Sequence, residues 1–277
     1  MLELVGVSHT YPNGTRALDD VSLSIPKGMF GLLGPNGAGK STLMRTIATL
    51  QAPTDGTIRF GDIDVLAEPD RLRRTLGYLP QDFGVYPRVS AQEMLDHMAV
   101  LKGVTAKGER RAMVEHLLNQ TNLWNVRGKA IAGFSGGMRQ RFGIAQALIG
   151  DPQLIIVDEP TAGLDPEERN RFVDDVADLC PRMAVLAGGR VRLEGAPHDL
   201  IARTKGRVWQ KTVPHTMLGE MQAQHEVISH RFFAGDIVVH VLADSQPEGF
   251  APVSGGLEDV YFTTLAETRR APAAHAA

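Results

Sequence analysis

The residues best suited to chemistry in this chain stand in one glycine-rich stretch, Gly34-Pro35-Asn36-Gly37-Ala38-Gly39-Lys40-Ser41-Thr42. The stretch fits the pattern G-x-x-x-x-G-K-[ST], and it lies between an apolar run at residues 29–33 and a helix-like run at residues 41–48. Its glycines allow a tight turn that points successive backbone N–H groups inward, and the helix start adds a positive dipole end. Such a loop suits a polyphosphate, with Lys40 reaching the β- and γ-phosphates and the Ser41 hydroxyl placed to ligate Mg²⁺.

Two neighbouring carboxylates form a second candidate group. Asp158 and Glu159 follow four apolar residues, 154–157, which is typical of a buried parallel strand that presents acids at its C-terminal end. One carboxylate can hold Mg²⁺ through water, while the next can orient and activate an attacking water. A helix-capping turn is the simpler alternative for such a pair.

A third candidate site lies at Phe134-Ser135-Gly136-Gly137-Met138, directly before a helix-like run at residues 139–148. Ser135 is a good N-cap, and the two glycines leave bare N–H groups at the positive end of that helix. The pattern predicts a second anion site, although a serine and two glycines before a helix are usually just a cap.

The elements that would position these groups are an alternation of strands and helices. Strand-like runs cover residues 2–7, 21–25, 57–60 and 76–79, and apolar residues recur at helical spacing from 90 to 121. Residues 183–193 and 227–242 have the pattern of strand hairpins, and residues 256–262 that of a short amphipathic helix. His198 is expected at the surface, at the start of a helix. His225, His230 and His240 are also expected at the surface, because no Cys, Asp or Glu geometry beside them closes a metal site. Tyr11 lies on a turn after the first strand, where it could stack on an adenine ring or pack locally.

Composition limits the possible functions. The chain of 277 residues is 43% hydrophobic and 22% charged, as in soluble globular proteins, and its net charge of −3 without a dense basic run gives no support for a nucleic-acid partner. A single cysteine, Cys180, excludes an intrachain disulfide and fits a reducing compartment. The start lacks a signal-peptide pattern, and no run approaches the ~20 apolar residues of a membrane span. If a membrane is involved, another chain is expected to cross it.

Together these motifs resemble the ATP-binding subunit of an ABC transporter. The loop at 34–42, Gln81, residues 134–138, the acid strand 154–159 and Gly163-Leu164-Asp165 follow the family's order and approximate spacing over residues 1–206. The resemblance implies an α/β fold: a P-loop ATPase core with a mostly parallel central sheet, an antiparallel β subdomain and a helical subdomain at about 82–148. Residues 207–266 resemble the small α+β C-terminal extension of exporter-type ATPases, and residues 267–277 are expected to form a disordered tail.

The resemblance also assigns the site residues. Tyr11 would stack on adenine, residues 34–42 would hold the phosphates, and Ser41, Gln81 and Asp158 would surround Mg²⁺. Glu159 resembles the general base, acting with Lys40 and Gln81, and Asp165 belongs to the loop at the dimer seam. Ser135, Gly136 and Gly137 would face the γ-phosphate of a nucleotide bound by the partner chain.

By the same resemblance, the function is ATP hydrolysis that powers a separate membrane-spanning permease, with export favoured. The partners would be a second ATPase chain, identical or not, and the permease, docked on residues 82–148 and holding this chain at the cytoplasmic face of the membrane. A soluble P-loop kinase or GTPase is disfavoured, because the guanine-reading Asn-Lys-x-Asp is absent and such enzymes have no use for residues 134–138.

The chain departs from the family pattern in two places. Phe134 and Met138 stand where Leu and Gln are common. After Asp165 the family has a strand ending in a histidine that contacts the γ-phosphate; here one helix-like run, 166–179, leads to the hairpin, so roughly 20 residues are missing. Loss of such a preorganised contact commonly costs about 10²–10³ in rate. ATP binding should persist better than hydrolysis, and the alternative function is a nucleotide-binding module with weak or no hydrolysis.

Overall fold

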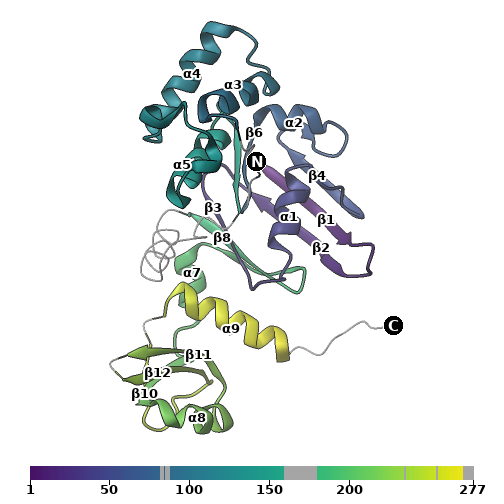
Figure 1. The fold of residues 1–277 in the computed structure, drawn as a ribbon. Helices are drawn as coiled ribbons and strands as arrows, with labels where there is room; N and C mark the ends of the chain where they lie inside the picture. Colours follow the sequence, from purple (N-terminus) through teal and green to yellow (C-terminus); the bar gives the residue numbers. More distant parts are fainter. Residues whose placement is uncertain (82–83, 85–87, 159–179, 234, 254, 271–277) are drawn as a thin grey trace. The chain divides into compact units, whose positions relative to one another are not determined.

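The computed structural model describes residues 1–81, 84, 88–158, 180–233, 235–253 and 255–270 (Figure 1). These residues form two compact units, one built from residues 1–10 and 41–158 and the other from residues 11–40 and 180–270. None of the helices in these described ranges is long and apolar enough to cross a bilayer.

An antiparallel sheet opens the first unit. Strand β1 (Leu2–Thr10) pairs with β4 (Asp55–Phe60), which pairs with β5 (Ile63–Asp64). Leu4 and Ile58 are direct partners in this register, and both are buried. The predicted strands at 2–7 and 57–60 are confirmed, each somewhat longer than its apolar run.

A short parallel pair of strands follows. Helices α1 (Lys40–Ile47) and α2 (Pro69–Thr75) precede β6 (Leu76–Leu79), which pairs with β7 (Leu154–Val157). The prediction that β7 is buried holds for Ile156 but is wrong for Ile155 and Val157, which are 46% and 37% exposed. Within the described residues, β7 pairs with β6 alone, so it lies at the edge of a two-stranded sheet and not in the interior of a larger one.

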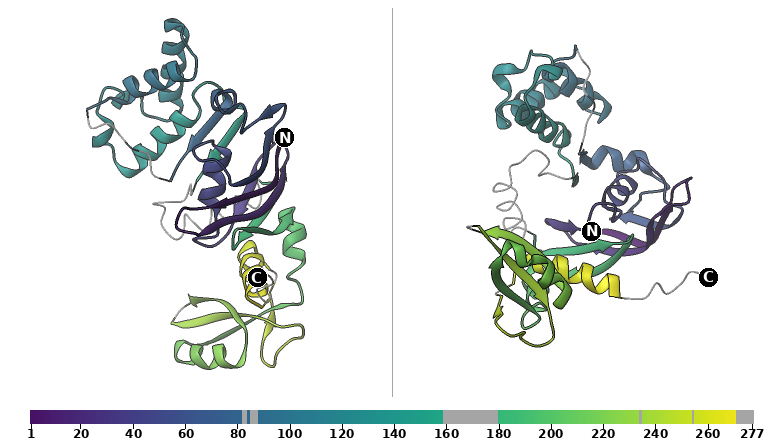
Figure 2. Two further views of the ribbon diagram at one scale, coloured as in Figure 1. Left: turned by 90° about the vertical axis from the view of Figure 1, so that its right-hand side faces the viewer. Right: turned by 60° about the horizontal axis from the view of Figure 1, so that its bottom comes forward.

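The helical part of the first unit contains α3 (Ala91–Leu101), α4 (Lys107–Gln120) and α5 (Gly136–Ala147), with 3-10 turns at Trp124–Val126 and Ile131–Gly133 (Figures 1 and 2). A capping box begins α3: the Ser90 hydroxyl accepts from the N–H of Glu93, whose carboxylate accepts from the N–H of Ser90. The three helices share one apolar core, which includes Met94, Leu95, Leu117, Leu118 and Phe142. The predicted helical spacing is therefore confirmed, except that Leu101 is 72% exposed.

In the second unit, β3 (Phe30–Leu33) pairs in parallel with β8 (Arg182–Ala187), and β8 pairs antiparallel with β9 (Arg190–Gly195). This confirms the predicted hairpin at 183–193. Strand β2 (Arg16–Ile25) lies beside β9, where the Asp19 N–H donates to the carbonyl of Gly189. Helix α7 (Pro197–Ala202) follows, and the exposed His198 lies in its first turn, as expected.

The C-terminal part of this unit has its own antiparallel sheet, in the order β11 (Val227–Phe233), β12 (Asp236–Leu242), β10 (Val208–Pro214) and β13 (Ala251–Pro252). One face of the sheet packs on the 3-10 turn His215–Met217 and on α8 (Leu218–Gln224) through an apolar core that includes Val213, Met221 and Val239. The hairpin predicted at 227–242 is confirmed, whereas β10 and α8 were not foreseen. The predicted domain boundary at 206 falls between α7 and β10.

The last helix, α9 (Leu257–Arg270), corrects two expectations. It lies beside β11 and continues through residues 267–270, which were predicted to begin a disordered tail (Figures 1 and 2). The cause is an ion pair at its end, where Arg270 binds Glu226. His240 was expected to lie on the surface, but its side chain is 15% exposed and hydrogen bonds, 2.8 Å, to the buried carboxylate of Asp259 in α9.

Candidate nucleotide-binding site

The glycine-rich loop connects β3 to α1, and two of its glycines are required by close backbone approaches. A Cβ at Gly34 would lie 2.3 Å from the carbonyl oxygen of Leu186 in β8, and one at Gly39 would lie 2.4 Å from that of Ala17. Gly37 and Gly39 also have φ values of +79° and +103°, which residues with a Cβ rarely adopt. The loop thus packs closely against Leu186 and Ala17 of its own unit, and only glycine at positions 34 and 39 allows these approaches.

Lys40 is held across this loop. Its ammonium donates to the carbonyl oxygens of Gly34 at 2.6 Å and Pro35 at 3.0 Å. Ala38 is buried, and its carbonyl accepts from the N–H of Gly189, whereas Asn36 and Gly37 are exposed. The exposed residues of the loop therefore lie beside a fixed cation, an arrangement that suits a phosphate group.

Ser41 and Asp158 meet in the first unit. The Ser41 hydroxyl donates to a carboxylate oxygen of Asp158 at 3.3 Å. Asp158 is buried, and its own N–H donates to the carbonyl of Leu79 at 2.9 Å, which anchors the carboxylate at the end of β7. A hydroxyl and an anchored carboxylate supply the hard oxygen ligands that Mg²⁺ prefers, so the residues present fit this metal.

Gln81 lies at the same C-terminal end of the parallel strands. Strands β6 and β7 are parallel, with Leu79 opposite Val157, so the residues that follow both strands emerge together. Gln81 itself is exposed, two residues beyond β6. The structure thus brings Ser41 and Asp158 into contact and places Gln81 at the C-terminal end of β6, beside the end of β7 that Asp158 follows.

Tyr78 adds a group that the sequence did not single out. Burial, and then the negative charge of Asp158, raise the pKa of the Tyr78 phenol above 10.0, although Arg45 opposes this through its charge and a hydrogen bond. Tyr78 and Arg45 therefore lie close enough to Asp158 to feel its charge. The sequence could have indicated that Tyr78 lies near the site, because it is in the strand that leads to Gln81.

The predicted second anion site lies at the start of α5. Ser135 caps the helix by accepting from the N–H of Met138 at 3.3 Å, and Ser135, Gly136 and Gly137 are all exposed. No atom lies within 4 Å of a Cβ placed on either glycine. Both glycine positions therefore border open space on the described part of the chain.

The structure gives Phe134, which stands where Leu is common in this motif, a packing role. Its side chain is 3% exposed and packs edge-on against Phe142, with ring centroids 6.4 Å apart and planes at 81°. The aromatic ring thus anchors the motif in the core of the helical part, which is a packing role that leucine could also fill.

Three other predicted residues have different outcomes. Tyr11 is half-buried in a turn of the second unit, closed by a hydrogen bond from the N–H of Gly14 to its carbonyl at 2.9 Å. Glu159 and Asp165 lie outside the described residues, so their roles remain predictions.

Comparison with known proteins identifies the family. The family model described as ABC transporter matches residues 18–162. The chain is 34% identical over 267 residues to the daunorubicin/doxorubicin resistance ATP-binding protein DrrA of Streptomyces peucetius, covering 89% of this chain and 78% of that protein. It is 31% identical over 263 residues to the linearmycin resistance ATP-binding protein LnrL of Bacillus subtilis, covering 87% and 83%.

Solved structures agree with this result. An ATP-binding subunit of an ABC transporter is 28% identical, with a TM-score of 0.65 over 73% of this chain and 92% of the other. A dimeric ATP-binding cassette bound to ADP and Pi is also 28% identical, with a TM-score of 0.61 over 71% and 98%. This chain belongs to the ABC transporter family, as an ATP-binding subunit with ATPase function.

Proposed function

We propose that this chain binds Mg·ATP and uses its hydrolysis to drive export through a separate membrane-spanning permease. The observation that carries the proposal is the contact between the Ser41 hydroxyl and the Asp158 carboxylate, directly after a loop in which two glycines cannot be replaced without a clash. Export is favoured because two relatives, matched over 89% and 87% of this chain, are named for resistance to daunorubicin/doxorubicin and to linearmycin.

The proposed roles follow the position of each side chain. Lys40 and the N–H groups of residues 34–42 would hold the phosphates, and Tyr11 would stack on adenine. Ser41, Gln81 and Asp158 would hold Mg²⁺, which offsets the negative charge on the phosphate oxygens. Glu159 would act as the general base, which takes a proton from the attacking water.

A second ATPase chain would complete the site. Ser135, Gly136 and Gly137 are exposed at the positive end of α5, with open space beside both glycines. They would bind the γ-phosphate of a nucleotide held by the partner's loop, while Asp165 would lie at the seam between the two chains. The relative bound to ADP and Pi is a dimer, which supports this arrangement.

The permease would dock on the helical part of the first unit. A cavity of about 890 Å³ opens between α3 and α4, lined by side chains that include Glu93, Asp96, His97, Arg111, Trp124 and Arg127. The Arg127 guanidinium lies over the Trp124 ring, 4.1 Å from its centroid, so one wall is a broad aromatic and cationic surface. A short permease helix in this cavity would hold the chain at the cytoplasmic face of the membrane.

The short segment after Asp165 should slow hydrolysis. The first histidine beyond Asp165 is His198, which is exposed in α7 rather than at the end of a strand from the central sheet. The alignment with DrrA extends over 267 residues yet uses 89% of this 277-residue chain, so some of its positions have no counterpart here. Both facts support a chain that lacks the histidine contact to the γ-phosphate.

Steady-state hydrolysis of Mg·ATP by the purified chain tests the proposal, with Glu159→Gln and Lys40→Ala measured beside it. We expect measurable turnover that both substitutions abolish, with Glu159→Gln still binding ATP and Lys40→Ala binding it weakly. Equal turnover by the wild type and Glu159→Gln would contradict the catalytic assignment. A wild type that binds ATP but is as inactive as the variants would favour the nucleotide-binding module.

A further inference from the structure

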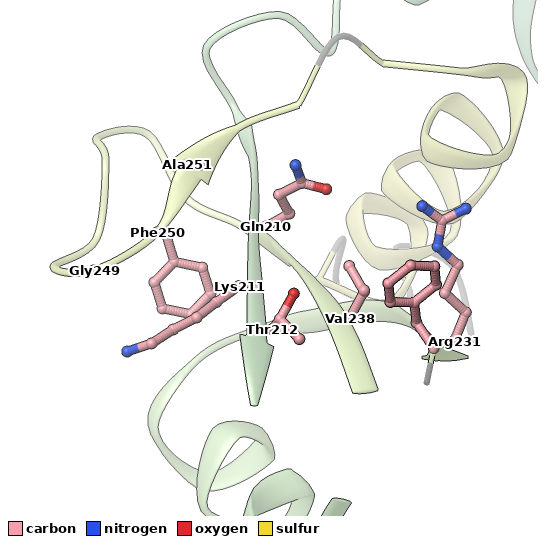
Figure 3. A pocket seen from close by; sticks show the side chains of 9 residues that line it. Gln210, Lys211, Thr212, Arg231, Val238, Gly249, Phe250 and Ala251 are labelled. Carbon is pink, nitrogen blue, oxygen red and sulfur yellow. The ribbon is translucent and has the colours of Figure 1, made fainter. Parts of the chain in front are cut away.

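The face of the C-terminal sheet opposite α8 carries a pocket that the ATPase function does not use. In the strand register, Thr212 of β10 is opposite Val238 of β12, which is opposite Arg231 of β11. Directly paired residues point to the same face of a sheet, so these three side chains form one row. Figure 3 shows this row, with Val238 between Thr212 and Arg231.

The pocket has a volume of about 550 Å³, within the range of small-molecule sites. Gln210 and Thr212 provide hydrogen-bonding groups, and Val238 and Phe233 provide apolar surface. Val238 is 8% exposed and Phe233 is 65% exposed, whereas Phe250, which also borders the pocket, is 4% exposed and belongs to the core on the α8 face. The lining therefore combines a polar row with one exposed aromatic side chain.

Of the two cations that border the pocket, Arg231 is the one that stands in the polar row. Lys211 and Arg231 line it, and none of the lining residues is acidic. The Lys211 ammonium lies 5.3 Å from the centroid of the Phe250 ring, and Gly249 leaves room for it, because a Cβ there would approach to 3.0 Å (Figure 3). Lys211 pairs with Val239, which belongs to the core on the α8 face, so its side chain lies beside Phe250 on the other side of β10 from Arg231 (Figure 3).

These two cations differ from others in the same part of the chain. Arg207 pairs with Glu267, and Arg270 pairs with Glu226. Within the described residues, Lys211 and Arg231 make no ion pair and no hydrogen bond through their side chains. Their charge is therefore available to a ligand.

The buried carboxylate of Asp259, in α9, is already engaged. Asp259 accepts from the N–H of Gly256 at 2.9 Å and hydrogen bonds to His240, two residues along β12 from Val238. Both of its oxygens are used to fix the start of α9. Asp259 therefore does not supply the counter-ion for Arg231.

We propose that this pocket binds a small organic anion that carries an apolar ring or chain, such as an aryl carboxylate. Arg231 would pair with the anionic group in bidentate fashion, with Thr212 and Gln210 donating further hydrogen bonds. Phe233 and Val238 would contact the apolar group. The site lies outside the nucleotide loop and adds a ligand to those of the ATPase reaction.

Calorimetric titration of the full chain with three probes tests this site: 1-naphthoate, the uncharged 1-naphthamide, and inorganic phosphate. We expect one equivalent of 1-naphthoate to bind, and the other two probes to bind at least about tenfold more weakly. Binding should persist in saturating Mg·ATP, because the nucleotide loop is a different site. Equal affinity for the amide or for phosphate, or displacement by Mg·ATP, would overturn the proposal.

Three variants locate the binding site. Arg231→Ala should weaken 1-naphthoate binding by about tenfold or more, and Arg231→Lys should restore part of the loss. Lys205→Ala removes an exposed cation outside the pocket and should leave the affinity unchanged. Unchanged thermal unfolding would show that the exposed Arg231 can be replaced without loss of fold. Equal binding by Arg231→Ala and the wild type would refute the assignment.

Discussion

The hydroxyl of Ser41 lies 3.3 Å from a carboxylate oxygen of Asp158, although 117 residues separate them in the sequence. Ser41 is in the first turn of α1, and Asp158 directly follows β7, where its backbone bond to Leu79 fixes its position. The contact joins the helix after the phosphate loop to the acid strand. Ser41 belongs to the first sequence motif and Asp158 to the second, so this hydrogen bond links residues of the two motifs.

Replacement of Asp158 by asparagine tests this contact. The amide oxygen of the new side chain can still accept from Ser41, so the fold should be retained, but the negative charge is lost. We expect a higher Mg²⁺ concentration for half-maximal hydrolysis and a rate lower by at least about tenfold, since a charged ligand binds the metal more strongly than an amide. Nucleotide binding in EDTA should match the wild type. An unchanged Mg²⁺ dependence would remove Asp158 from the metal site.

Gly34→Ala tests the packing of the phosphate loop on β8. The new Cβ would lie 2.3 Å from the Leu186 carbonyl oxygen, so the loop or the strand must move. The free energy of unfolding should fall by about 1–3 kcal/mol, and ATP affinity should fall with it. Gly136→Ala is the control, because no atom lies within 4 Å of its Cβ. Urea unfolding and ATP titration provide the measurements, and equal stability of the two variants would argue against the clash.

Gly137→Asp separates folding from dimer function. Residue 137 is exposed at the start of α5, where a carboxylate suits the helix dipole, so the single chain should remain folded and bind ATP. In the proposed dimer the same carboxylate would face the partner's γ-phosphate and repel it. We expect ATP-dependent dimerisation and hydrolysis to be lost, measured by light scattering and phosphate release. Dimerisation equal to that of the wild type would contradict the assigned interface.

The raised pKa of Tyr78 predicts a loss of stability in alkali. Burial and the charge of Asp158 raise the pKa of the phenol above 10.0 in the folded chain, so between the unfolded and folded values the folded state binds more protons. The free energy of unfolding should be unaffected below about pH 10 and fall as the pH rises further. Tyr78→Phe should reduce that fall in urea unfolding between about pH 8 and 11. Parallel curves for both chains would show that the Tyr78 environment is less buried than described.

The phosphate loop could be predicted because its determinants are local. Glycines, a lysine and two hydroxyls at fixed spacing specify a turn followed by a helix, and α1 begins at Lys40, one residue before the expected run. The helical part was also predictable, since Met94, Leu95, Leu117 and Leu118 recur at helical spacing and share one core. In both cases neighbours in the sequence decide the structure.

Elements that depend on distant partners could not be predicted in this way. Strand β10, Val-Trp-Gln-Lys-Thr-Val-Pro, becomes a strand because it lies between β12 and β13, and no local pattern marks it. The last turn of α9, Glu-Thr-Arg-Arg, has no apolar residues and is held by the ion pair of Arg270 with Glu226. His240 was expected at the surface because its partner, Asp259, is 19 residues away.

Strand β8 links the C-terminal helix α9 to the phosphate loop, and so to ATP binding. The carbonyl of Leu186 at one end of this strand borders Gly34, while Met183 near the other end packs with Leu257 and Val260 of α9. The wall of the phosphate loop therefore rests on the same strand that α9 covers. Deletion of the chain from Leu257 onward would expose the side of β8 that α9 covers. Because β8 also borders the phosphate loop, we expect the affinity for ATP to fall.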